Sequence, residues 1–82
     1  MPYIHQDERD SAIHTPRSAG QLNYAITQLL VGYAEREGLC YQTINDIVGA
    51  MECCKSEFYR RVVIPYEDAK RKENGDVYGD LV

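Results

Sequence analysis

The sequence lacks most of the residues on which hydrolytic enzymes and metal sites are built. Its 82 residues include no Trp, one Phe and only two His, and no Gly-rich phosphate loop, G-x-S-x-G or H-E-x-x-H occurs. His5 and His14 lie near the N-terminus without a Ser or Cys partner at a readable spacing, so a nucleophile–base pair is not supported. We therefore expect no enzymatic activity, no metal ion and no cofactor.

Long hydrophobic runs and an export signal are also absent. A run such as Leu29-Leu30-Val31 is far shorter than the roughly 20 apolar residues that cross a bilayer. Residues 1–9 show no basic segment followed by an apolar one, which a secretory signal requires. We expect a cytoplasmic protein with no membrane partner.

The three cysteines form neither a disulfide framework nor a C-x-x-C motif, and Cys53 and Cys54 are adjacent. In a cytoplasm their thiols stay reduced. Burial as small apolar side chains is the expected role of all three. Cys40, just after a predicted helix end, is the alternative candidate for a functional thiol.

Charge and size restrict the possible partners. The net charge of −4 argues against duplex DNA as a partner, because non-specific DNA affinity is largely electrostatic, although a local basic pocket is compatible with it. A chain of 82 residues builds only a small core, and such domains often need a partner subunit. Seven Tyr residues, which suit half-wet surfaces, add to this argument. We expect a homo-oligomer.

The spacing of apolar residues predicts a first long helix over residues 19–37. Ser18 is a plausible N-cap, and Gly38 can end the helix because it accepts a positive φ. The apolar positions recur at intervals of three and four residues; they are Leu22, Ile26, Leu29 and Tyr33.

A second helix of about eighteen residues follows after a short connection. Thr43 with Asp46 resembles a capping box and predicts its start. Gly49 lies within this helix, either as a tolerated weak spot or as a point of close helix–helix approach. The apolar positions form one stripe along it: Ile44, Ile47, Val48, Met51, Cys54, Phe58 and Val62.

Pro65 is expected to stop or kink the second helix, and a third helix should run from there to about Asn74. The predicted fold is therefore all-α: an antiparallel helical hairpin plus a third helix after Pro65, assembled as a homo-oligomer. Residues 1–17 should form an N-terminal arm, with one short helical turn around residues 7–13, and residues 18–82 a single helical domain.

Two groups of polar residues are candidates for a ligand site. Tyr59, Arg60 and Arg61, with Lys55 nearby, offer a stacking ring and phosphate-binding guanidinium groups. Asn23 and Tyr24 lie on the polar side of the first helix. Glu57 can pair with Arg61, which leaves Arg60 without an obvious helical partner. The alternative interpretation of both groups is a solvated helix face.

Several longer stretches carry a resemblance to known sequences: Leu22–Thr27, Tyr41–Cys53, Glu57–Asp68 and Glu73–Tyr78. They resemble a family of small, uncharacterised helical proteins encoded by bacteriophages and bacteria, over about residues 20–78. The family provides no catalytic residue to carry over. In size and setting it is similar to the phage sponges that sequester nucleotide signals of host defence.

Two functional hypotheses remain. In the first, the protein captures a small phosphorylated nucleotide, of the cyclic oligonucleotide or cyclic ADP-ribose type, in the host cytoplasm without cleaving it. The ligand would lie at a subunit interface, between Tyr59, Arg60 and Arg61 on one side and Asn23 and Tyr24 on the other. In the second, the protein is an adaptor or inhibitor that docks a host or phage protein through its Tyr-rich surface. Nucleotide processing is a distant third.

Overall fold

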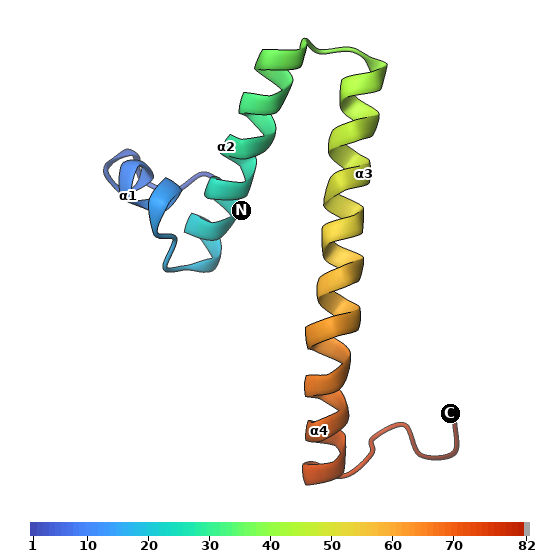
Figure 1. Ribbon diagram of the computed structural model, residues 1–82. Helices are drawn as coiled ribbons and strands as arrows, with labels where there is room; N and C mark the ends of the chain where they lie inside the picture. The colour runs from blue at the N-terminus through green and yellow to red at the C-terminus, as the bar shows by residue number, and fades with distance from the viewer. Residues whose placement is uncertain (82) are drawn as a thin grey trace. The chain divides into compact units, whose positions relative to one another are not determined.

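The computed structural model describes residues 1–81, and the regular structure of this range is entirely helical (Figure 1), which confirms the all-α prediction. The described chain forms two compact units, residues 1–47 and residues 48–81, with the boundary inside α3. The elements are η1 (Gln6–Glu8), α1 (Arg9–His14), α2 (Ala19–Glu37), α3 (Tyr41–Phe58), the π-helical η2 (Tyr59–Val63), α4 (Ile64–Asn74) and η3 (Gly79–Leu81).

Helix α2 begins and ends where the sequence predicts. The Ser18 hydroxyl accepts a hydrogen bond from the Gln21 N–H at 3.1 Å, so one of the unpaired amides of the first turn is satisfied. Gly38 follows the last residue with φ of 87°, a conformation that costs a glycine little. Both predicted ends of this helix are confirmed.

The N-terminal residues pack closely on the start of α2. The predicted short helical turn is confirmed by η1 and α1, and Ala12 of α1 is fully buried. The Gln21 side-chain amide donates to the Glu8 carboxylate at 2.8 Å. A Cβ atom on Gly20 would lie 3.2 Å from the Ile4 side chain, so the two segments approach each other closely at this glycine.

Helix α3 begins earlier than predicted. Its first residue is Tyr41, and the carbonyl of Cys40 accepts the first helical hydrogen bond, from the Ile44 N–H at 2.9 Å. The predicted cap at Thr43 is therefore wrong: Thr43 lies inside the first turn, where its hydroxyl contacts the Cys40 thiol at 3.4 Å. The chain reverses between α2 and α3, and the Tyr33 hydroxyl donates to Asp46 at 3.4 Å. Beyond this contact the hairpin stays a prediction.

Pro65 does not stop the helical path, so this part of the prediction is wrong, and the alternative of a kink stays a prediction. Proline has no N–H to donate, and its ring clashes with the carbonyl four residues earlier. The backbone adapts by widening into the π-helical η2, where the Ile64 N–H reaches back to the Tyr59 carbonyl. Helix α4 then continues directly and ends at Gly75, which has φ of 94°.

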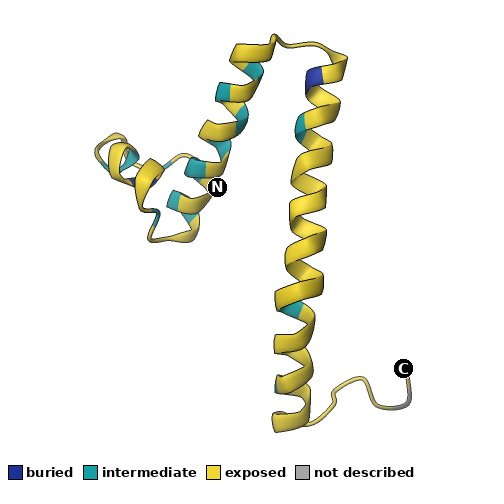
Figure 2. Cartoon of the chain, viewed as in Figure 1, coloured by how far each residue is buried: buried dark blue, intermediate teal, exposed yellow. Residues whose placement is uncertain are grey.

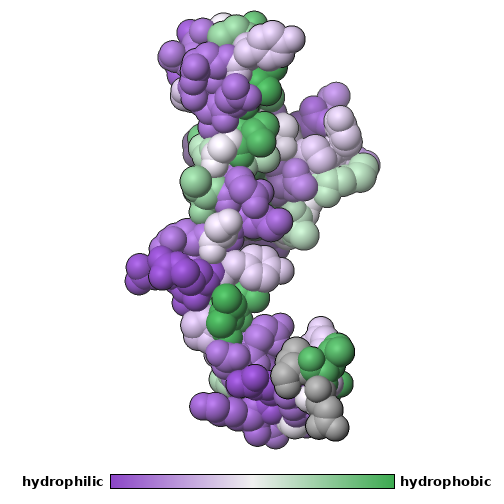
Figure 3. All heavy atoms as spheres, turned by 90° about the vertical axis from the view of Figure 1, so that its right-hand side faces the viewer, coloured by the Kyte–Doolittle hydropathy of each residue, from purple (hydrophilic) through white to green (hydrophobic). Residues whose placement is uncertain are grey.

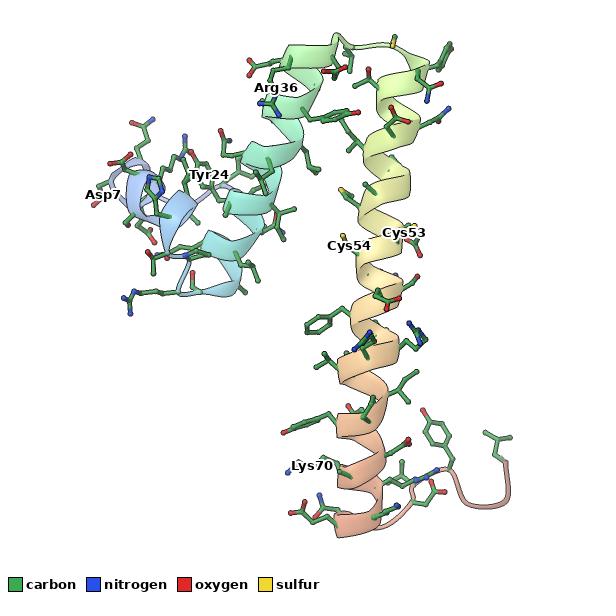
Figure 4. All side chains as sticks on the ribbon, in the orientation of Figure 1. Asp7, Tyr24, Arg36, Cys53, Cys54 and Lys70 are labelled. Carbon is green, nitrogen blue, oxygen red and sulfur yellow. The ribbon has the colours of Figure 1, made fainter. Side chains whose placement is uncertain are left out.

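Within the described residues, only Ala12 and Thr43 are buried (Figure 2). Hydrophobic side chains accordingly reach the surface between hydrophilic ones (Figure 3). The prediction of buried thiols is wrong, because Cys40, Cys53 and Cys54 are all exposed. Cys53 and Cys54 point away from α3 on different sides (Figure 4). No helix in residues 1–81 is long and apolar enough to cross a membrane.

Candidate functional site

Three of the predicted site residues, Tyr59, Arg60 and Arg61, lie together in η2. Both guanidinium groups approach the same oxygen of Glu57, in the last turn of α3. The distance is 2.6 Å from Arg60 Nη2 and 3.9 Å from Arg61 Nη1. The prediction that Arg60 lacks a helical partner is therefore wrong, because Glu57 lies three residues before it. Two cations thus share one carboxylate, and the turn keeps a net positive charge.

This turn is open to solvent. The side chains of Arg60, Arg61 and Glu57 are 68%, 70% and 55% exposed. Ion pairs at such exposure contribute only about 0.2–1 kcal/mol each, so the guanidinium groups can exchange the carboxylate for another anion at little cost. Tyr59 is also 52% exposed, and Lys55, one turn earlier, makes no ion pair within residues 1–81.

The π-helical backbone distinguishes this turn from the other helical turns of residues 1–81. Such segments are rare and occur frequently at functional sites, because they change the direction of side chains within an otherwise regular helix. The reason for this segment is local, since Pro65 removes an amide that the turn would otherwise use. The sequence identified the cluster by residue type, and the backbone provides a second reason to single it out.

Asn23 and Tyr24 lie in α2, in the other compact unit. Asn23 is exposed, and its carbonyl accepts a hydrogen bond from the Thr27 hydroxyl at 2.8 Å. Tyr24 is half-buried, and the guanidinium of Arg9 lies 5.6 Å from the centre of its ring. Figure 4 shows Tyr24 on the side of α2 that carries α1. It stays a prediction that Asn23 and Tyr24 form one site with the turn of Tyr59, Arg60 and Arg61.

Arg9 is a candidate residue that the sequence analysis did not identify. Its Nε and Nη2 atoms donate to the Ile4 carbonyl at 3.3 and 3.2 Å, which fixes the guanidinium over Tyr24. Within residues 1–81 it has no carboxylate partner. No sequence signal reveals this arrangement, because the packing of α1 on α2 brings together residues that are far apart in the chain.

A separate hollow lies between α4 and the C-terminal tail. Its two cations, Lys70 and Arg71, already pair with Glu73 at 3.6 Å and Asp68 at 3.8 Å. It contains none of the predicted site residues. The hollow is lined by Glu67, Asp68, Lys70, Arg71, Gly75, Asp76, Val77 and Tyr78.

Two groups near the α2–α3 connection have perturbed acidities. The negative charge of Asp46, together with its hydrogen bond, raises the pKa of Tyr33 above 10.0. Hydrogen bonds from the Thr43 side chain and backbone lower the pKa of the Cys40 thiol below 9.0. No group of three or more metal-binding side chains occurs within residues 1–81.

Comparison with known proteins identifies the family. No curated protein and no solved structure matches the chain. A family model described as a domain of unknown function, DUF6899, matches residues 1–77. The match includes the N-terminal segment, so the family extends beyond the resemblance seen over about residues 20–78. This chain belongs to the DUF6899 family.

Proposed function

We propose that this protein is a small binding protein, encoded by a phage or a bacterium, that sequesters a nucleotide second messenger of host antiviral defence without cleaving it. The observation that carries the proposal is the exposed turn in which Arg60 and Arg61 share the carboxylate of Glu57 beside the ring of Tyr59. Guanidinium groups bind phosphate with paired donors, and a tyrosine ring stacks on a base.

The pair of Arg9 and Tyr24 supports the proposal independently. It repeats the combination of a cation and an aromatic ring, on a different element of the chain. A cyclic nucleotide carries both phosphates and bases, so two such groups suit one ligand. Neither group is a cleft, and a ligand needs to be largely enclosed. The proposal therefore includes self-association, with the ligand between protomers in the host cytoplasm.

A nucleotide panel tests the proposal. Cyclic dinucleotides, cyclic trinucleotides and cyclic ADP-ribose isomers are added separately, and the melting temperature of the protein is measured. At least one ligand should raise it, and chromatography after heat denaturation should recover that ligand intact. Recovery of a cleaved product would exclude sequestration, and the absence of any shift across the panel would exclude these classes of nucleotide.

Two variants test the site itself. Arg60→Ala or Arg61→Ala should weaken binding roughly 10- to 150-fold, because a charge-assisted hydrogen bond contributes about 1.5–3 kcal/mol. Arg71→Ala is the matched control, since Arg71 forms a similar exposed pair with Asp68 at 3.8 Å. Equal affinities in all three variants would place the ligand elsewhere.

A second candidate function is an adaptor or inhibitor that docks another protein. It is favoured by the exposure of the tyrosines, because Tyr side chains are enriched at protein interfaces. This function predicts no nucleotide-induced melting shift and a specific protein that co-purifies from host cells. The most exposed tyrosines are Tyr41 (88%), Tyr3 (79%), Tyr78 (64%) and Tyr66 (62%).

A further inference from the structure

One face of the second unit carries a row of exposed apolar side chains. We call it the apolar strip; its members are separated by three, seven, four and four residues, spacings that place them on one side of the helical path. Within residues 48–81 no other long helix lies against it. The strip consists of Val48 (57% exposed), Met51 (43%), Phe58 (60%), Val62 (49%) and Tyr66 (62%).

The strip is a sizeable apolar patch. Its five side chains, each about half exposed, present roughly 450 Å² of apolar surface, within the ~300–600 Å² of the largest patch on a typical monomer, which is often functional. Lys55, between Met51 and Phe58, and the neighbouring Tyr59 extend this surface toward the ~800 Å² per partner that a standard interface buries. A second surface packed on the strip would remove this apolar area from water.

Helix α2 of the same chain is too short to cover the whole strip. It has 19 residues, and its one side-chain hydrogen bond to α3 joins Tyr33 to Asp46. If α2 packed antiparallel on the helical path with Tyr33 opposite Asp46, its first residue, Ala19, would lie opposite about residue 60. Val62 and Tyr66 lie beyond that point.

The pattern of the strip fits a second copy of the same chain. Val48, Lys55 and Val62 occupy the a positions of a heptad repeat, and Met51 and Phe58 occupy the d positions. In a parallel pair in register, Lys55 would face Lys55 of the second copy, and like charges at an interface are unfavourable. In an antiparallel pair a positions face d positions, so each Lys55 would lie opposite an apolar side chain and direct its ammonium group outward.

We infer that the apolar strip is the interface of an antiparallel homodimer related by a two-fold axis, in which each strip packs on that of the second copy. The inference deepens the proposed function, because it names the surface through which the protomers associate. It also places the turn of Arg60 and Arg61 at the edge of the interface, directly beside Phe58 and Val62. The dimer requires no nucleotide to form.

A charged substitution tests the interface. Phe58→Asp and Val62→Asp should each raise the dissociation constant of the dimer at least thirtyfold, because they bury an unpaired charge. Ile64→Asp is the control: Ile64 is 51% exposed on the same helical path, but two residues from Val62 and therefore on another face. Light scattering over a dilution series measures the mass, and circular dichroism checks the helix content. A monomeric wild type, or three variants with equal dissociation constants, would overturn the inference.

Cross-linking tests the orientation without destabilising the fold. All three native cysteines are exposed, so they can be replaced by Ser. In this background, mixtures of Met51→Cys with Val62→Cys, of Val48→Cys with Phe58→Cys, and of Phe58→Cys with Val62→Cys test three registers in which a faces d. An antiparallel dimer should oxidise to a mixed disulfide faster in one mixture than in either variant alone. Self-linkage of each single variant would establish a parallel pair and overturn the inference. A dimer that shows no nucleotide-induced melting shift would refute only the proposed function.

Discussion

Replacing Gly49 by Ala tests whether the middle of α3 is an open helix surface or a point of close helix contact. A Cβ atom built on Gly49 meets no atom of the described residues within 4 Å. A glycine in a helix interior is about 1 kcal/mol less favourable than an alanine. With no steric cost to offset the gain, Gly49→Ala should stabilise the protein by about 1 kcal/mol and raise its melting temperature by about 4–8 °C.

A close helix contact at Gly49 would give the stability change of Gly49→Ala the opposite sign. If another helix approached Gly49 closely, an added methyl group would overpack that contact and cost about 1–3 kcal/mol. Gly49 lies about 100° around the helix from Val48, on the side away from Met51, and therefore outside the apolar strip, so the inferred dimer also predicts stabilisation. Thermal unfolding followed by circular dichroism, at several protein concentrations, separates the two cases.

Two other glycines provide controls. In Gly20→Ala the new methyl group would lie 3.2 Å from the Ile4 side chain, so the helix-propensity gain should be reduced or lost. Gly38 has φ of 87°, which is unfavourable for alanine, so Gly38→Ala should destabilise the protein by about 1 kcal/mol or more. A lower melting temperature for Gly49→Ala than for wild type, or dissociation of its oligomer, would refute the open-surface interpretation.

Three further predictions concern single side chains. Glu57→Gln should raise the affinity for an anionic nucleotide about two- to fivefold, because it removes the exposed carboxylate that competes for the guanidinium groups; calorimetry showing no gain would contradict this. The Asp46 charge raises the pKa of Tyr33, so their contact should persist below pH 10 and be lost as the pH rises through the raised value. In Asp46→Asn the pKa of Tyr33, followed by the absorbance of its phenolate, should return toward 10.0. Tyr33→Phe provides the spectrum of the other tyrosines for subtraction. Because Thr43 lowers the pKa of the Cys40 thiol, Cys40 should alkylate fastest of the three cysteines at pH 8, and Thr43→Val should slow it; equal rates would show that the hydrogen bond has no effect.

The sequence was sufficient where a helix end depends on a single local residue. Ser18 and Gly38 each act within one turn of the backbone, so the predicted bounds of α2 are correct. At α3 the capping pattern in the sequence does not mark the start of the helix. The Thr43 and Asp46 pair matches a capping pattern, but the chain begins the helix earlier and Asp46 instead accepts hydrogen bonds from Gln42 and Tyr33. The Tyr33 contact depends on a chain reversal, which a capping pattern does not include.

The candidate site was predictable to a similar extent. Residue type and spacing were enough to identify Arg60 and Arg61, because neighbours within one turn are fixed by the helix itself. The sequence analysis paired Glu57 with Arg61 alone and overlooked Arg60, which lies three residues after Glu57 and reaches the same carboxylate. Arg9 was missed because its position over Tyr24 depends on how α1 packs on α2, and no local rule contains that information.

Pro65 connects the local backbone to the candidate function. By withholding an N–H it prevents the preceding turn from closing as a regular α-helix, and the chain accommodates this with the five-residue π segment Tyr59–Val63. That segment contains both arginines of the candidate site. The side chains of both arginines are exposed there, at 68% for Arg60 and 70% for Arg61, so an anionic ligand can reach them. The same proline therefore interrupts the helical hydrogen bonds and positions the cluster that the proposed function uses.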